Sequence, residues 1–129
     1  MSYHLKILEK DVLTEGQFVN AQGSTESVEF VRQAAGASPT SVWRPGAPIL
    51  TSKMGVIRRG TAIATFDVKG RYPTGGRGKH AAIYLWHDDC GIRVLDQSNR
   101  QGHVAERTIR ANRPDFPRVD CAKFYFVIE

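Results

Sequence analysis

The sequence predicts an α+β fold in which an N-terminal helix packs against an antiparallel sheet. The one strong helical pattern lies in the first third of the chain, at residues 24–36, and short alternating segments typical of strands follow Gly60. A helix followed by strands, rather than alternating with them, indicates α+β architecture. The chain has 129 residues, 41% of them apolar, which is enough for one core, so we expect a single domain covering residues 1–129.

The predicted helix at residues 24–36 has a clear apolar stripe and clear ends. Ser24 or Thr25 would cap its first amides, and Gly36 would end it. A shorter helix is expected within residues 5–13. The side chains expected to form the buried stripe are Val28, Phe30, Val31, Ala34 and Ala35.

Residues 37–54 are predicted to be a long connector, because three prolines and Gly46 interrupt them. Trp43 is expected to anchor this connector in the core. Strands are predicted at residues 61–66, 80–86, 92–96, 107–110 and 121–128.

Two of these strands form a predicted hairpin around a turn at residues 87–91. His80 begins the first strand and Asp96 ends the second. Because side chains alternate between faces, equal parity about the turn should place both on one face, within hydrogen-bonding reach. A carboxylate beside an imidazole fixes its tautomer, as a general base requires. Gln97 is the less suitable partner, because its parity directs it to the other face.

The net charge of +5 favours an anionic partner, and the basic residues are scattered along the chain. Nucleic acid, a membrane surface and the bacterial cell wall all fit this charge. Basic and aromatic residues are not interleaved as in known nucleic-acid-binding modules, so we expect no nucleic-acid partner. No apolar run approaches the ~20 residues of a membrane helix, and residues 1–10 lack the apolar core of a secretory signal. We therefore expect neither membrane insertion nor export by a signal peptide.

The cysteines and histidines give no metal-binding pattern. Cys90 and Cys121 are the only cysteines, and a disulfide or two free thiols are equally compatible with the sequence. None of the four histidines has the close spacing of a metal-binding pair. We expect neither a metal nor a cofactor.

Five segments, taken together, resemble the small amidase effectors of type VI secretion and, more distantly, the NlpC/P60 and CHAP peptidases. The resemblance spans about residues 22–110. It implies a papain-like NlpC/P60 fold in which the N-terminal helix carries the nucleophile. The segments are Glu26 to Val31, Trp43 to Gly46, Gly60 to Phe66, His80 to Tyr84, and Asp96 with Gln97.

The resemblance implies a cysteine-peptidase mechanism acting on peptidoglycan. Residue 27 would attack a peptide carbonyl, His80 would transfer the proton, Asp96 would orient His80, and the amide of residue 27 would help bind the oxyanion. The bond cut would be D-glutamyl to diaminopimelate or the diaminopimelate to D-alanine cross-link, and we favour the cross-link. The resemblance further implies contact-dependent injection, action in the periplasm of the target cell, and an immunity protein that protects the producer.

One residue departs from the family pattern: serine occupies position 27, where the family has cysteine. A thiol at a helix N-terminus ionises readily, whereas a serine hydroxyl does not. Ser27 could be an engineered replacement that disarms a toxic hydrolase, a natural serine nucleophile, or the mark of a descendant that only binds. We favour the first, with a catalytically dead module that binds the cell wall or the immunity protein as the alternative function.

Overall fold

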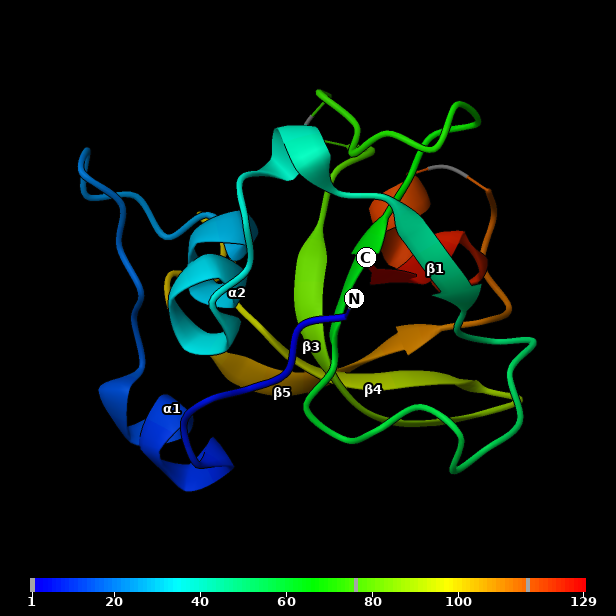
Figure 1. Ribbon diagram of the computed structural model, residues 1–129, viewed down its shortest axis with the longest axis horizontal. Helices are drawn as coiled ribbons and strands as arrows, with labels where there is room; N and C mark the ends of the chain where they lie inside the picture. The colour runs from blue at the N-terminus through cyan, green and yellow to red at the C-terminus, as the bar shows by residue number, and fades with distance from the viewer. Residues whose placement is uncertain (1, 76, 116) are drawn as a thin grey trace.

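The computed structural model describes residues 2–75, 77–115 and 117–129, and its centre is a six-stranded antiparallel sheet (Figure 1). The strand order is β1-β6-β2-β3-β4-β5. The strands are β1 (Pro45–Pro48), β2 (Ala62–Thr65), β3 (Ala81–Asp88), β4 (Gly91–Asp96), β5 (Ala105–Arg110) and β6 (Tyr125–Ile128). The α-helices are α1 (Glu9–Glu15) and α2 (Ser27–Ala35), and 3-10 turns occupy Thr40–Val42, Arg118–Asp120 and Ala122–Phe124. The predicted α+β class is confirmed.

Helix α2 forms where the apolar stripe predicts it and packs against β3. Phe30, Val31, Ala34 and Ala35 are buried, whereas Val28 is only partly buried. Gly36 ends the helix in the left-handed conformation, at a φ of 69° that suits glycine.

The predicted caps of α2 are wrong. The N-cap residue is Glu26, and no side chain caps the helix. The Ser24 hydroxyl donates to Asn20 instead, and the Thr25 hydroxyl donates to the carbonyl oxygen of Ser98 at 3.0 Å. The Thr25 contact ties the segment before α2 to the loop after β4, and neither hydroxyl caps the first turn of the helix.

Both faces of the sheet carry apolar clusters. On the α2 face, Ile83 and Leu95 pack with the helix and with Trp43, which is buried as predicted. On the other face, Tyr84 and Tyr125 belong to a second cluster covered by the connection between β1 and β2. The central strands are therefore buried on both sides, which explains their nearly continuous apolar sequences.

Three predicted boundaries needed correction. The first helix begins at Glu9 rather than residue 5, because the backbone around His4 pairs with Thr61 beside β2. The connector at residues 37–54 contains the edge strand β1, where prolines are tolerated because one side of the strand is unpaired. The last strand begins at Tyr125, because residues 122–124 form a 3-10 turn that leaves Phe124 partly exposed.

A β-bulge interrupts the pairing of β3 with β4. Trp86 lies opposite Arg93, but the next pair is Tyr84 with Val94, so Leu85 has no partner. A bulge of this kind shifts the register of every pair beyond it by one residue.

The bulge decides which face Asp96 occupies. Counted from the two-residue turn, an unbroken ladder would place Leu95 opposite Tyr84, whereas the structure places it opposite Ile83. A one-residue shift exchanges the two faces of a strand. Without the bulge, Asp96 would point away from His80. The equal parity that the sequence argument assumed is therefore produced by the bulge rather than by the turn.

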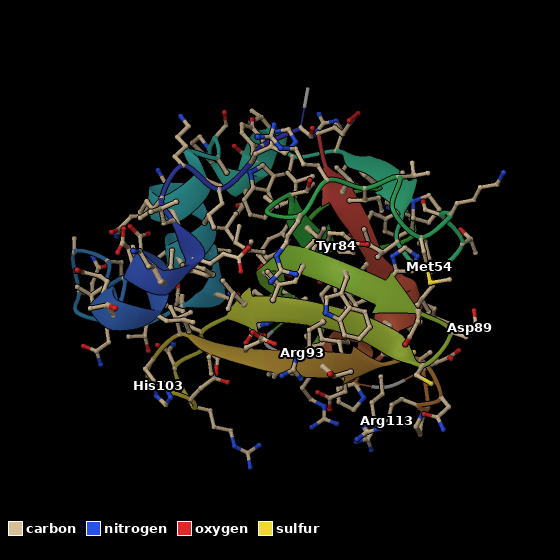
Figure 2. All side chains as sticks on the ribbon, turned by 90° about the horizontal axis from the view of Figure 1, so that it is seen from below. Met54, Tyr84, Asp89, Arg93, His103 and Arg113 are labelled. Atoms are coloured by element: carbon tan, nitrogen blue, oxygen red, sulfur yellow. The ribbon has the colours of Figure 1, made fainter. Side chains whose placement is uncertain are left out.

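The β3–β4 turn and the β4–β5 connection lie at opposite ends of the sheet. Figure 2 shows Asp89, in the turn, far from His103, in the connection. Cys90 in the turn is exposed and Cys121 is buried, and both are free thiols. Within the described ranges, no helix combines the length and apolar character needed to cross a bilayer.

Candidate active site

His80 is the residue directly before β3, and a buried hydroxyl holds its backbone. The Thr65 hydroxyl accepts a hydrogen bond from the amide of His80 at 3.0 Å and donates one to the carbonyl oxygen of Gly78 at 2.7 Å. The residue His80 is 7% exposed, and its ring lies edge-on to Tyr125, with centroids 6.4 Å apart. Thr65 thus fixes the backbone of His80, and Tyr125 packs against its imidazole ring.

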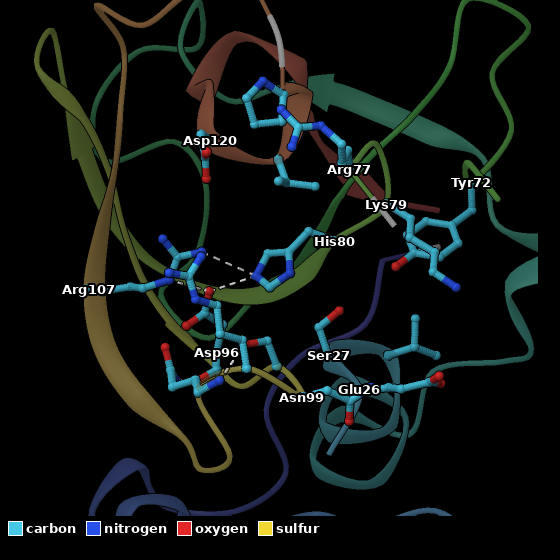
Figure 3. Close-up of a pocket in the computed structure, with 16 residues that line it drawn as sticks. Glu26, Ser27, Tyr72, Arg77, Lys79, His80, Asp96, Asn99, Arg107 and Asp120 are labelled. Carbon is cyan, nitrogen blue, oxygen red and sulfur yellow. Dashed lines mark hydrogen bonds and ion pairs between the residues drawn. The ribbon is translucent and has the colours of Figure 1, made fainter. Parts of the chain in front are cut away.

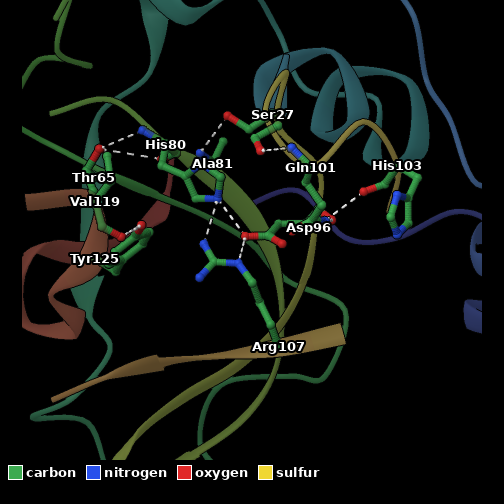
Figure 4. A network of polar contacts seen from close by, with 11 residues as sticks. Ser27, Thr65, His80, Ala81, Asp96, Gln101, His103, Arg107, Val119 and Tyr125 are labelled. Carbon is green, nitrogen blue, oxygen red and sulfur yellow. Dashed lines mark hydrogen bonds and ion pairs between the residues drawn. The ribbon is translucent and has the colours of Figure 1, made fainter. Parts of the chain in front are cut away.

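Asp96 and Arg107 complete a polar network around this imidazole (Figure 4). His80 Nε2 lies 2.6 Å from Asp96 Oδ2, and Arg107 Nε donates to the same oxygen at 2.7 Å. The Asp96 side chain is 1% exposed, whereas that of Arg107 is 35% exposed. The predicted contact between His80 and Asp96 is confirmed. Arg107 binds the same carboxylate, which the sequence did not predict.

The network selects one tautomer of His80. Asp96 can only accept, so Nε2 carries the proton, and Nδ1 is the basic nitrogen of the neutral ring. Arg107 lies 3.4 Å from Nε2, but both groups are donors, so this contact is not a hydrogen bond. Asp96 Oδ1 is buried and has no hydrogen-bond partner among the described residues. The carboxylate therefore holds the imidazole through one oxygen.

Ser27 is the first residue of α2 and faces the same cleft. Its side chain is almost buried, and its Oγ accepts a hydrogen bond from the amide of Ala81 at 3.2 Å. Ala81 directly follows His80, so this bond brings the start of the helix beside the imidazole. Figure 3 shows Ser27 below the His80 ring, with Asp96 on the other side of that ring.

The cleft has a volume of about 750 Å³ and is lined by Ser27, His80 and Asp96 together. Four cations also line it, namely Arg77, Lys79, Arg100 and Arg107, against the acidic Glu26, Asp96 and Asp120. The cleft thus combines the Ser27 hydroxyl, an imidazole held by a carboxylate, and an excess of positive charge. It can accommodate an anionic peptide.

No set of three or more acidic, histidine or cysteine side chains is arranged to hold a metal ion in the part of the chain that the structure describes. His87 is buried on the second cluster, where its Nδ1 contacts the Tyr84 hydroxyl at 2.6 Å and its Nε2 contacts the carbonyl oxygen of Ser52 at 2.8 Å. These contacts give His87 a structural role between β3 and the neighbouring loop.

Comparison with known proteins identifies the family. The model of the domesticated amidase effector 2 family matches residues 4–127. The chain belongs to this family. A Salmonella typhi protein described as a type VI secretion amidase effector 2 protein is 35% identical over 115 residues, which cover 81% of this chain and 84% of that protein. A solved structure of type 6 secretion amidase effector 2 matches with a TM-score of 0.74 and 30% identity, and the match covers 95% of this chain and 94% of that one.

The structure of this amidase effector brings together the three side chains that the sequence analysis predicted as site residues. Ser27, His80 and Asp96 come from the start of α2, the start of β3 and the end of β4. Gln97 does not contact His80. Its side chain instead binds both backbone groups of Phe18 and the carbonyl oxygen of Glu26, and so anchors the segment that leads into α2.

Sequence reasoning missed two residues that hold the site. Arg107 lies on β5 opposite Val94. Val94 and Asp96 are two residues apart on β4 and share a face, so pairing β5 with β4 would have placed Arg107 on the face of Asp96. The sequence does not mark Thr65 as a site residue, because threonine is common in β-strands and usually has no role in a functional site. Its role depends on the return of the chain through Gly78 to the start of β3.

Proposed function

We propose that this protein is a peptidoglycan peptide amidase of the type VI secretion effectors. Residue 27 occupies the nucleophile position, His80 is the general base, and Asp96 orients His80. The observation that carries the proposal is the convergence of these side chains at one cleft, with the imidazole held by the carboxylate at 2.6 Å. The family description and the names of both relatives, which specify amidase effectors, support amide hydrolysis.

The proposed reaction follows from the tautomer of His80. His80 Nδ1 takes the proton of the γ-atom of residue 27, and that atom then bonds to the acyl carbon. The carbon–nitrogen bond then breaks, and the imidazolium returns the proton to the leaving amine. Water, activated by the same nitrogen, hydrolyses the acyl-enzyme. Asp96 supports the positive charge that the ring carries between these steps.

The architecture supports a papain-like NlpC/P60 relationship as part of this proposal. A helix N-terminus carries the nucleophile position, and the helix packs on an antiparallel sheet that supplies the histidine and its acidic partner from neighbouring strands. The absence of a side-chain cap leaves the positive end of the α2 dipole directed at the cleft.

We propose that serine at position 27 makes this chain inactive or nearly so. A serine hydroxyl does not ionise at a helix N-terminus, so it depends on a hydrogen bond to the base. The Ser27 oxygen is bonded to the amide of Ala81, and the structure contains no hydrogen bond from Ser27 to the His80 ring. The contacts of Asp96 and Arg107 around His80 support the proposal that residue 27 alone departs from a working site.

The proposed substrate is the peptide part of peptidoglycan, and we favour the diaminopimelate to D-alanine cross-link. Arg77, Lys79 and Arg100 line the cleft and would attract the carboxylates of such peptides. Delivery through the secretion system and action in the target periplasm follow from the effector assignment. A producer of such a hydrolase also needs an immunity protein, which we propose binds over this cleft.

The test is mass spectrometry of muropeptides after purified peptidoglycan is treated with the Ser27→Cys protein. We expect new fragments whose masses identify the cut bond, no fragments with Ser27→Ala, and loss of activity when His80→Ala is added to Ser27→Cys. Intact muropeptides with a folded Ser27→Cys protein would refute the proposal.

The alternative is a catalytically dead module that binds the cell wall or the immunity protein, and serine at position 27 is the observation that favours it. Co-sedimentation of the unmodified protein with peptidoglycan, combined with the cleavage assay on the Ser27→Cys protein, separates the two functions. Under the alternative, the protein binds the wall, the Ser27→Cys protein cuts nothing, and His80→Ala changes neither property.

A further inference from the structure

The Tyr72 hydroxyl is a buried polar group that the reaction above does not use. Tyr72 lies in the connection between β2 and β3 and lines the cleft beside Ser27. Its hydroxyl oxygen is inaccessible to solvent and has no hydrogen-bond partner among the described residues. Buried hydroxyls are nearly always paired in folded proteins, so this oxygen needs an explanation.

The neighbour of this hydroxyl is the nucleophile position. Figure 3 shows the Tyr72 hydroxyl directed toward Ser27, on the side opposite Asp96. Burial raises the pKa of the Tyr72 hydroxyl well above its ordinary value, and the neighbouring Ser27 side chain offsets only part of that rise. The phenol therefore stays protonated at neutral pH and can donate, yet its geometry with the Ser27 oxygen does not make a hydrogen bond.

The phenol is held in place by its own packing. Its ring lies edge-on to Trp43, with centroids 5.0 Å apart and an interplanar angle of 69°. Trp43 is 1% exposed, and its indole nitrogen donates to the carbonyl oxygen of Ser38 at 2.7 Å. The donor is thus preorganised, which makes it most effective toward a charged atom.

Two donors therefore surround the γ-atom of residue 27. The amide of Ala81 already donates to it at 3.2 Å, and the Tyr72 hydroxyl points toward it from within the cleft. Two fixed donors stabilise an anion far more than a neutral hydroxyl. A sulfur atom is larger than oxygen and lies farther from Cβ, so it accepts hydrogen bonds from donors that a serine oxygen cannot reach.

We propose that Tyr72 is a further catalytic residue, whose hydroxyl donates a hydrogen bond to a thiolate at position 27. It has no partner among the described residues because serine stands at that position. The inference rests on the proposed function, which places a cysteine nucleophile at this position. In the reaction, the hydrogen bond holds the thiolate until its electron pair forms the bond to the acyl carbon, and no proton leaves Tyr72.

Other charged groups also act on this atom, so the test must isolate the phenol. Tyr3→Phe is the matched control, because Tyr3 packs against the same cluster but its hydroxyl binds Ser38. The remaining titratable or charged groups that line the cleft with Ser27 are Glu26, Arg77, Lys79, His80, Asp96, Arg100, Arg107 and Asp120. None of them changes between the Tyr72→Phe protein and its control.

The experiment measures alkylation of the Ser27→Cys protein by iodoacetamide across pH, alone and with Tyr72→Phe or Tyr3→Phe. Below the pKa of the thiol, the rate follows the thiolate fraction, and at high pH it reaches a limit. We expect Tyr72→Phe to lower the rate at neutral pH about tenfold and to leave the high-pH limit nearly unchanged, as for loss of one charge-assisted hydrogen bond. Tyr3→Phe should change neither. Superimposable profiles for Tyr72→Phe and its parent, or an equal effect of Tyr3→Phe, would overturn the inference.

Thermal unfolding supplies a second measurement that does not depend on alkylation or catalysis. In the unmodified chain, Tyr72→Phe removes an unpaired buried hydroxyl, so the melting temperature should stay the same or rise. In the Ser27→Cys protein at a pH where the thiol is ionised, the same substitution should lower it. Equal shifts in the two backgrounds would count against the inference.

The two proposals fail in different ways. Ready, Tyr72-dependent alkylation without peptidoglycan cleavage would reject the proposed substrate and leave the role of Tyr72 standing. Cleavage of peptidoglycan that is independent of Tyr72, with identical alkylation profiles, would reject the role of Tyr72 alone.

Discussion

The hydroxyl of Thr65 offers the sharpest test of how the fold holds His80. Thr65 is fully buried, and its hydroxyl joins the amide of His80 to the carbonyl oxygen of Gly78. Thr65→Val replaces this hydroxyl by a methyl group of nearly the same size. The side chain still fills its site, so the substitution isolates the two hydrogen bonds.

The expected cost follows from the burial of each group. The amide of His80 would be left buried without a partner, which costs about 1–3 kcal/mol. The carbonyl of Gly78 is only partly buried and can be hydrated, so its lost bond costs about 0.5–1.5 kcal/mol. The added methyl group returns about 0.8 kcal/mol. We therefore expect Thr65→Val to lower the free energy of unfolding by about 2 kcal/mol.

Urea denaturation measures this loss, with Thr65→Ser as the matched control. Serine keeps both hydrogen bonds and loses one buried methyl group, which costs about 1 kcal/mol. Valine should therefore be the more destabilising replacement, although it preserves the volume. A Thr65→Val protein as stable as its parent, or less perturbed than Thr65→Ser, would refute the assignment of this hydroxyl as the clamp on His80.

Two further predictions concern the β4–β5 pair and a surface ion pair. Gly91→Ala would place a Cβ against the backbone oxygen of Ile109, so we expect a loss of more than about 2 kcal/mol in urea unfolding or failure to fold. Gly75→Ala, which meets open space, should stay within about 0.5 kcal/mol, and similar losses for both would refute the clash. The hydrogen bond from Arg59 lowers the pKa of Glu9, so the pair stabilises the fold above the ordinary pKa of glutamate and loses this effect as pH falls. Because both side chains are about a third or more exposed, Glu9→Gln should cost at most about 1 kcal/mol at pH 7. The difference from the parent should shrink as the pH falls below the ordinary pKa of glutamate, and a difference that does not change with pH would contradict the assignment.

The sequence by itself determined the local elements and the identity of the chemical groups. The apolar stripe at Phe30 and Val31 specifies which side of α2 is buried, since helical spacing alone sets that side. The segments beginning at His80 and ending at Asp96 specify a hairpin, because strand alternation and a turn are local properties. The pattern around residue 27, from which we propose the nucleophile position, is likewise local in sequence.

Tertiary structure alone decided how these groups meet. The bulge at Leu85, which lies within the pairing of β3 with β4, places Asp96 on the face of His80. Arg107 and Thr65 join the site through pairing between strands, which depends on contacts distant in sequence. The orientation of Tyr72 depends on its packing against Trp43. Local sequence specifies elements through short-range sterics and periodicity, whereas these contacts require the whole chain to have folded.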